Sequence, residues 1–302
     1  MRLDLQSIRE NNLNIDFLAK KLVEGFITGL HKSPYHGFSV EFAEHRIYNT
    51  GESTRHIDWK VLAKTDRLYT KTFEEETNLR CHILIDVSNS MLYPGKEKKK
   101  LYYSIYSAAA LSWLLYKQRD AVSITTFSNH IIEQTAVRST SAHLQKVFGI
   151  LDNTLDKTTD EHSTNLSKVI HEISNTIHKR SLVVLFSDMI TTEDNESEMA
   201  EALMHLKHNK HEILLFHVRD KATEEEFDFK ELPHLFIDLE SGEKVKLRPS
   251  EIRAYYIDSA HKRTQYLKEL CGELKIDLVE IDTAEDINTV LNAYFIKRTK
   301  LG

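Results

Sequence analysis

Short apolar runs alternate with longer amphipathic segments over most of the chain after residue 80. The apolar runs are rich in branched aliphatic residues and end at polar ones, which is typical of buried strands. They cover residues 81–85, 122–127, 182–187, 212–218 and 276–281. The segments with helical spacing cover residues 101–118, 141–155, 165–178, 194–208, 249–274 and 284–298. The four lysines among residues 96–100 precede the first of these helices, and we expect them to be solvated. This alternation predicts right-handed crossovers and an α/β fold with a doubly wound, mainly parallel sheet.

Two pairs of short apolar runs predict β-hairpins. Residues 131–136 return along the run 122–127 after a turn at Asn129-His130. Residues 235–239 and 244–247 flank a Ser-Gly turn. Turn-forming residues between two apolar runs are the usual signal for such hairpins.

The chain before residue 80 has a different pattern. Residues 1–30 have apolar positions at a spacing of four and predict a helix. Residues 38–78 are irregular and crowded with charges, and residues 68–76 within them predict an edge strand that runs into an acidic loop. We therefore expect an N-terminal appendage of helix and extended chain over residues 1–79, followed by the α/β domain over residues 80–302.

Composition places the protein among ordinary soluble chains. Its 302 residues are 41% hydrophobic and 28% charged, enough for a sizeable core. The formal net charge of −6 argues against nucleic-acid binding through phosphate neutralisation. There is no secretory signal pattern, and no apolar run approaches the ~20 residues that span a bilayer, so we expect no membrane insertion. Cys81 and Cys271 fall in separate predicted elements as buried thiols, which favours a reducing, cytoplasmic location.

Asp86-x-Ser88-x-Ser90 follows the first apolar run and places a carboxylate and two hydroxyls on one tight turn, the Asp86 turn. Open α/β sheets bind their ligands at this end of their strands. Oxygen ligands suit a hard divalent cation such as Mg²⁺. The alternative is that these side chains cap the following helix.

The Asp86 turn resembles the first loop of the metal-ion-dependent adhesion site of von Willebrand factor A domains. In that family a Thr from a second loop and an Asp from a third complete the site. The resemblance implies Thr164 and Asp188 in these roles, around Mg²⁺ or Mn²⁺. The family often has a glycine just before the Thr and this chain does not, so Thr158 and Thr159 remain alternatives for the second loop.

A longer pattern precedes that turn. It reads E-F…R-x-Y-x-x-G-E-x-x-R-x-I-D-W over residues 41–59 and K-x-F-E-x-E over residues 71–76. Together with the Asp86 turn it is similar to the DUF58 family of bacterial proteins, which carry a von Willebrand A-like domain and are often associated with MoxR-type AAA+ ATPases. The resemblance implies that fold and a MoxR-like ATPase as partner. Family members more often have Gly-Asp where Gly51-Glu52 stands.

The polar residues of this pattern have two interpretations. Arginine–carboxylate pairs and an indole can brace the appendage against the sheet, because the guanidinium fork suits bidentate pairing. They can instead form a recognition surface for a partner. We favour the brace. The residues concerned are Arg46, Glu52, Arg55, Asp58 and Trp59.

Known catalytic patterns fit poorly. A haloacid-dehalogenase-like phosphatase needs a second carboxylate where Ser88 stands. A serine nucleophile elbow, G-x-S-x-G, needs glycines two positions before and after its serine, where Ser88 has Asp86 and Ser90. A receiver domain needs an acidic pair from another strand end. His205, His208 and His211 do not complete a zinc site. With 9 glycines, the chain has neither a P-loop nor a dinucleotide-binding motif.

The sequence therefore predicts a non-enzymatic adaptor that binds a partner's carboxylate through a metal ion. The alternative is a metal-dependent hydrolase of the phosphoesterase type, in which the same ion acts as a Lewis acid. His162 is the candidate base for that reaction.

Overall fold

The computed structural model describes residues 14–27, 40–47, 58–65, 67–75, 79–93, 99–156, 166–190, 196–237, 243–287 and 289–291. The chain forms two compact units, a smaller one over residues 33–79 and a larger one that contains the remainder. The first helix, α2 (Ile15–Ile27), therefore belongs to the larger unit and not with the rest of the appendage that we expected over residues 1–79. The reason is that α2 packs on α4 (Lys99–Lys117) and buries Leu18 and Leu22 there completely.

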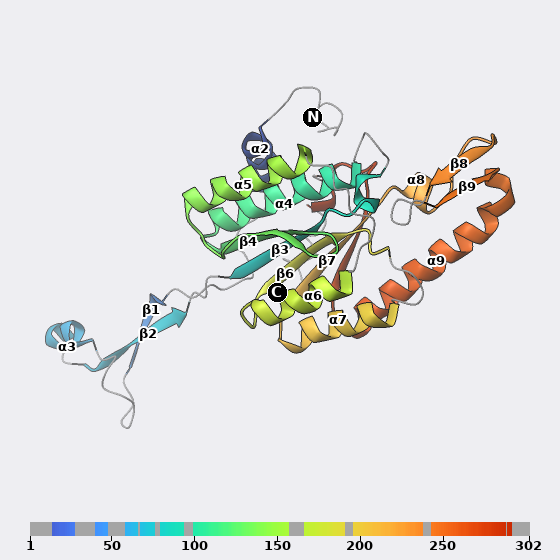
Figure 1. Ribbon diagram of the computed structural model, residues 1–302. Helices are drawn as coiled ribbons and strands as arrows, with labels where there is room; N and C mark the ends of the chain where they lie inside the picture. Colours follow the sequence, from blue (N-terminus) through green and yellow to red (C-terminus); the bar gives the residue numbers. More distant parts are fainter. Residues whose placement is uncertain are drawn as a thin grey trace. The chain divides into compact units, whose positions relative to one another are not determined.

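A six-stranded sheet forms the centre of the larger unit (Figure 1). Its strands run in the order β10-β7-β6-β3-β4-β5, all parallel except β5, which pairs antiparallel with β4. Their bounds are β3 (Arg80–Asp86), β4 (Ala121–Phe127), β5 (Ile131–Gln134), β6 (Leu182–Ser187), β7 (Glu212–Arg219) and β10 (Asp277–Asp282). The predicted α/β class with a mainly parallel, doubly wound sheet is confirmed, as is the first hairpin.

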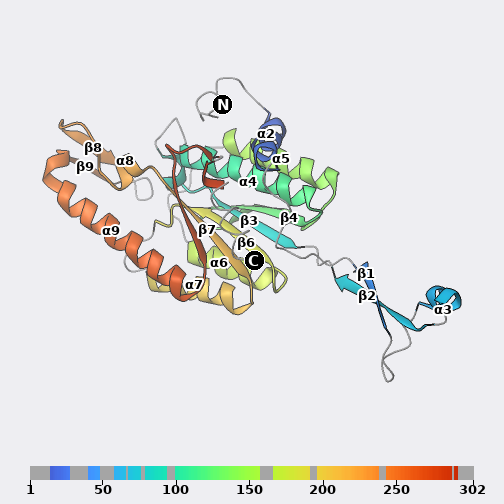
Figure 2. The same cartoon turned by 180° about the vertical axis from the view of Figure 1, so that it is seen from behind.

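Helices cover both faces of this sheet (Figures 1 and 2). One layer contains α2, α4 and α5 (Ser141–Asp156). The other contains α6 (Leu166–Thr176), α7 (Glu196–His208) and α9 (Pro249–Glu273). A parallel sheet covered on both faces needs strands that are apolar throughout, which explains the continuous apolar runs in the sequence.

Helix α4 is buried over most of its length. After its first turn most of its side chains are apolar or small, and Tyr103, Ile105 and Ala108 are fully buried. Its buried serines bond within the helix, since Ser104 Oγ donates to the Lys100 carbonyl at 2.8 Å and Ser112 Oγ to the Ala108 carbonyl at 2.7 Å. Helix α4 contacts β3 and β4 of the sheet and also α2 and α5, so little of its surface lies in solvent.

Smaller elements lie at the carboxyl end of the sheet. The chain leaves β7 through the short helix α8 (Lys221–Glu224) and then forms the antiparallel hairpin β8 (His234–Ile237) and β9 (Lys244–Leu247). The predicted second hairpin is thus confirmed. Phe227 stacks on Phe236 and packs against Tyr256 of α9, which holds the hairpin to that helix.

The smaller unit contains an antiparallel pair of strands, β1 (Val40–Ile47) and β2 (Tyr69–Glu75), and the helix α3 (Trp59–Thr65). The strand expected at residues 68–76 is present as β2 and pairs with β1 in a sheet of its own. The sequence pattern had indicated no regular structure for β1. A bulge between Phe42 and Glu44 interrupts its alternation, which explains why the period-2 signal was weak.

Within the described residues, no helix combines the length and the apolar character that crossing a membrane requires.

Candidate metal centre

The sheet changes winding direction between β3 and β6. The connection that leaves β3 runs through α4 on one face, and the connection that leaves β6 runs through α7 on the other. Adjacent strands whose connections diverge in this way leave a crevice at their carboxyl ends, where α/β proteins bind ligands. Asp86 ends β3, and Asp188 directly follows β6. The structure thus brings together these two predicted ligands, which are separated by about a hundred positions in the sequence.

The Asp86 turn is buried and closed by its own side chains. Asp86 is only 1% exposed, and its Oδ1 accepts a hydrogen bond from the Ser88 backbone N–H at 3.0 Å. The hydroxyls of Ser88 and Ser90 lie 3.0 Å apart and are also buried. A short 3-10 helix, η2 (Ser90–Leu92), begins here, and its N-cap residue Asn89 makes no side-chain cap hydrogen bond.

The turn after β6 presents Asp188 to the same edge. Met189 has φ of 52°, a left-handed conformation that reverses the chain immediately after Asp188. Asp188 Oδ1 accepts a bond from the Ile190 N–H at 3.3 Å, and the Asp188 carbonyl lies 3.0 Å from His217 Nε2. Burial lowers the pKa of His217 to about 4, so the ring is neutral and Nε2–H is the donor. These bonds fix the Asp188 carboxylate without neutralising it.

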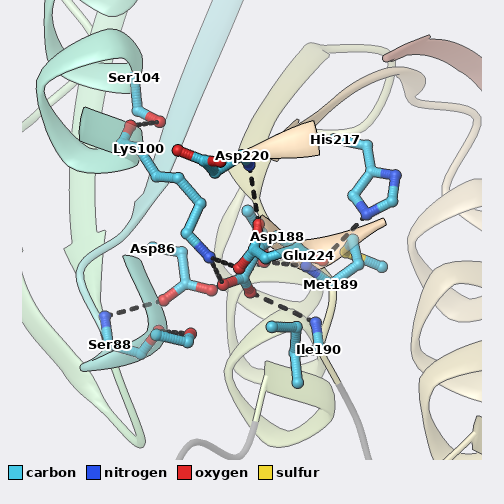
Figure 3. A network of polar contacts seen from close by, with 12 residues as sticks. Asp86, Ser88, Lys100, Ser104, Asp188, Met189, Ile190, His217, Asp220 and Glu224 are labelled. Atoms are coloured by element: carbon cyan, nitrogen blue, oxygen red, sulfur yellow. Dashed lines mark hydrogen bonds and ion pairs between the residues drawn. The ribbon is translucent and has the colours of Figure 1, made fainter. Parts of the chain in front are cut away.

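A third group that the sequence reasoning missed enters the site from α4. Lys100 is fully buried, and its ammonium lies 2.8 Å from Asp188 Oδ2 and 2.5 Å from Glu224 Oε1 (Figure 3). Glu224 ends α8, and its Oε2 accepts a bond from the Asp220 N–H at 2.8 Å. The expectation that the lysines among residues 96–100 are solvated is therefore wrong for Lys100, which lies in the first turn of α4 and is buried.

A signal for Lys100 was present in the sequence. It lies three and seven positions before Tyr103 and Ser107, so all three share the face of the helix that is buried. A lysine on the buried face of a helix needs a carboxylate partner, because an unpaired buried charge is very costly. The pattern did not indicate which carboxylates these would be.

The electrostatics of the site leave Asp86 without a cationic partner. Burial, and then the charge of Asp188, raise the pKa of Asp86 to about 7, against the hydrogen bonds from Ser88 and Ser187 that lower it. Burial alone would lower the pKa of Lys100, but the charges of Asp188 and Glu224 raise it above its ordinary value, so the ammonium stays charged. Among the described residues, Asp86 forms no ion pair.

This donor set fits a hard divalent ion. Two carboxylates and a pair of hydroxyls offer oxygen atoms only, and the uncompensated charge on Asp86 favours a cation. Thr164, Thr158 and Thr159 lie outside the described residues, so their part in the site stays a prediction. In the parts of the chain that are described, no group of three or more His, Cys, Asp or Glu side chains forms an alternative metal cluster.

The histidines weighed for zinc do not converge. His205 Nδ1 lies 3.0 Å from His171 Nδ1 on the neighbouring helix, whereas His211 Nδ1 accepts a bond from the Ser181 N–H at 3.2 Å. His211 is buried, and its role is to fix the start of β6.

A cavity of about 80 Å³ adjoins Asp188 on the side of α9. His217, Arg219 and Glu224 line it from the sheet edge, and Tyr256 and Arg263 line it from α9. His217 Nδ1 has no hydrogen-bond partner among the described residues. Apolar side chains complete the lining, among them Met199 of α7 and Leu267 and Leu270 of α9.

The brace residues are only partly described. Asp58 caps α3, because its Oδ1 accepts bonds from the N–H groups of Lys60 at 2.9 Å and Val61 at 3.3 Å. Trp59 is 62% exposed. Arg46 lies in β1, and Glu52 and Arg55 lie outside the described residues. The choice between brace and recognition surface for this set stays a prediction.

Comparison with known proteins places the chain in a family. The family model described as "Protein of unknown function DUF58" matches residues 44–266, from within β1 to within α9. The chain belongs to the DUF58 family. The matched region of this DUF58 protein includes the Asp86 turn, Lys100, Asp188 and Glu224.

Relatives with curated sequences are distant. This DUF58 protein is 25% identical over 100 residues to the uncharacterized protein Mb1516 of Mycobacterium bovis and to the uncharacterized protein Rv1480 of Mycobacterium tuberculosis. The match covers 33% of this chain and 32% of each relative, so it spans about a third of the length of the curated relatives.

Similar solved structures are also remote. The conserved hypothetical protein BatB from Bacteroides thetaiotaomicron aligns at 15% identity and a TM-score of 0.42, over 74% of this chain and 99% of that one. An aerotolerance-related membrane protein from Bacteroides fragilis aligns at 14% identity and 0.39, over 72% and 99%. Proximal thread matrix protein 1 from the mussel byssus, "with zinc occupied MIDAS motif", aligns at 12% and 0.36, over 47% and 38%. These TM-scores are too low to extend any property of those proteins to this one.

Proposed function

We propose that this DUF58 protein is a non-enzymatic adaptor that binds a partner protein through a divalent metal ion, Mg²⁺ or Mn²⁺, held at the Asp86 turn. The observation that carries the proposal is that Asp86 and Asp188 lie together at the carboxyl ends of β3 and β6, where the sheet changes winding direction. Both carboxylates are buried, and Asp86 has no cationic partner among the described residues. A buried carboxylate without a counter-charge is costly, and a cation at that edge removes the cost.

Each residue of the site has a distinct part in this proposal. Asp86 and Asp188 supply the negative charge, and the hydroxyls of Ser88 and Ser90 supply neutral oxygens, with Thr164 as the expected contribution of the second loop. A divalent ion with so few anionic ligands stays electron-poor and can accept a carboxylate from another protein. The backbone bonds to Asp86 and Asp188 hold both carboxylates in place before any ligand arrives, which reduces the entropic cost of binding.

The partner that the family resemblance implies is a MoxR-type AAA+ ATPase. An acidic side chain on its surface would be the group recognised, because that is the ligand an electron-poor divalent ion prefers. The contact between the ion and that carboxylate would be a charge-assisted bond that the interface shields from water.

The described residues offer less support for the hydrolase alternative. His217 is the imidazole in contact with this site, and its Nε2–H is engaged by the Asp188 carbonyl. Its Nδ1 has no hydrogen-bond partner among the described residues, but burial lowers the pKa of the ring to about 4, which makes it a weak base. His162 lies outside the described residues.

Two measurements on purified protein test the proposed function. Calorimetric titration with Mn²⁺ should show one site in the native protein, weakened by about a hundredfold in Asp86→Ala through loss of a ligand. Asp152→Ala, which removes an exposed carboxylate on α5, is the matched control and should bind as the native protein does. Equal Mn²⁺ affinity in native protein and Asp86→Ala would refute the metal site.

The second measurement concerns the partner. A MoxR-type ATPase from the same organism, immobilised on a biosensor, should retain the native protein in Mg²⁺ and release it in EDTA. Asp86→Ala should be retained poorly in both buffers, and Asp152→Ala should behave as native. Binding that is insensitive to both EDTA and Asp86→Ala would remove the metal-bridged mode of docking.

A further inference from the structure

Lys100 places a positive charge on one of the two carboxylates that would hold the ion. Its ammonium contacts Asp188 Oδ2 at 2.8 Å, and the lysine side chain has no exposure to solvent. A charged group in this position competes with a metal ion for the same oxygen, because both draw on the same negative charge. The competition is strong in a buried site, where water screens little.

Glu224 gives the same ammonium a second anchor. Glu224 Oε1 lies 2.5 Å from Lys100 Nζ, and its other oxygen accepts the Asp220 N–H at 2.8 Å (Figure 3). Because this bond fixes Glu224 at the end of α8, the ammonium keeps one carboxylate partner when Asp188 turns to another cation. The Lys100 ammonium can therefore be shared between Asp188 and Glu224 or be held by Glu224 alone.

We propose that Lys100 is a built-in competitor of the metal ion for Asp188, and that Glu224 sets the outcome by holding the ammonium when the ion binds. This inference rests on the proposed metal site, and it states which residues set the affinity of that site for the ion. Lys100 lowers the affinity of the site for the ion, and Glu224 raises it.

Formal charge alone gives a sharp comparison between variants. The native group of Asp86, Asp188, Glu224 and Lys100 sums to −2 when all four are ionised. Lys100→Met changes the sum to −3, and Glu224→Gln changes it to −1. The double variant Lys100→Met/Glu224→Gln returns the sum to −2 but leaves Asp188 free of the ammonium.

The test is calorimetric titration of these proteins with Mn²⁺ at about pH 8, which lies above the raised pKa of Asp86. Lys100→Met should bind Mn²⁺ about tenfold more tightly than native, and Glu224→Gln about tenfold more weakly. The double variant should also bind more tightly than native at the same formal charge. Lys146→Met, which removes an exposed lysine on α5, should leave the affinity unchanged.

Folding of each variant is checked by near-ultraviolet circular dichroism in the same buffer. The double variant leaves one buried carboxylate without a cation where Lys100→Met leaves two, so it keeps the test open if Lys100→Met alone fails to fold.

The outcomes separate this inference from the metal site itself. A folded Lys100→Met or double variant with native or weaker Mn²⁺ affinity refutes the proposed competition between Lys100 and the ion. The metal site itself is tested separately, by the loss of Mn²⁺ affinity in Asp86→Ala. If a purely net-charge effect operates, the double variant matches native and the inference fails. Absence of Mn²⁺ binding in the native protein would refute the proposed function and this inference together.

Discussion

The Ser187 hydroxyl donates a hydrogen bond to Asp86 Oδ2 at 2.7 Å, from the last residue of β6 to the last residue of β3. Ser187 Oγ itself accepts a hydrogen bond from the Met189 N–H at 2.9 Å. One buried hydroxyl thus joins the Asp86 turn to the turn that presents Asp188. It sets how far apart the two carboxylates lie, without being a ligand in the proposed site.

Ser187→Ala should therefore weaken both the fold and the metal site. Loss of a buried hydrogen bond to a charged acceptor costs about 1–3 kcal/mol in the free energy of unfolding, measured by urea denaturation in EDTA. Mn²⁺ affinity should fall as well, because the two turns lose their link. Ser112→Ala is the control, a buried serine whose hydroxyl bonds within α4, and it should leave Mn²⁺ affinity unchanged. Full Mn²⁺ affinity in Ser187→Ala would show that the link is not needed.

Lys100→Met should destabilise the protein in the absence of metal. Removing the ammonium leaves Asp188 and Glu224 buried without a cation, and breaking such a pair costs about 3–5 kcal/mol in the free energy of unfolding. Urea denaturation in EDTA measures the loss. Adding Glu224→Gln should recover part of it, because one of the stranded charges disappears. A double variant less stable than Lys100→Met would contradict this account of the ion pairs.

His82 should make the folded state sensitive to mild acid. Burial, and then the charges of His211, His178 and Arg80, lower the pKa of His82 from 6.5 to about 4. Its Nδ1 lies 2.9 Å from Ser123 Oγ. The unfolded chain binds the proton more readily than the folded one, so this stability is present above pH 6.5 and is lost as the pH falls towards 4.

The size of the effect follows from the shift in pKa. It amounts to about 3 kcal/mol in the free energy of unfolding between those two pH values. His82→Gln should flatten the pH dependence measured by urea denaturation, and His261→Gln, at an exposed position on α9, should not. Equal slopes for native protein and His82→Gln would rule out His82 as the source.

Neither thiol should react in the folded protein. Burial raises the pKa of Cys81 well above its ordinary range, with a contribution from the charge of Asp120, and burial raises the pKa of Cys271 to about 11. A thiol reagent such as iodoacetamide attacks the thiolate, which is nearly absent at neutral pH. Mass spectrometry should find both cysteines unmodified in buffer and modified in guanidinium chloride. Rapid labelling of Cys81 in buffer would indicate that β3 opens locally.

The order of elements in the larger unit could be predicted from the sequence. Apolar runs such as residues 182–187 and the helical spacing between them are local signals, because strand and helix periods are set within a few residues of backbone. The Asp86 turn was also readable, since its ligand types stand together in the chain. Asp188 was identified through the resemblance to von Willebrand A domains, and it follows an apolar run as Asp86 does.

The tertiary structure alone decided which charges meet. Lys100, Asp188 and Glu224 come from α4, the turn after β6 and α8, and the contacts of Lys100 span 88 and 124 positions. No local pattern encodes such contacts, because they depend on the strand order and on the helix layers that bring these segments to one edge. The same reason explains why Lys100 was wrongly expected to be solvated, and why α2 was wrongly expected outside the larger unit. Periodicity told which face of a helix is buried, and only the assembled sheet determined what that face would touch.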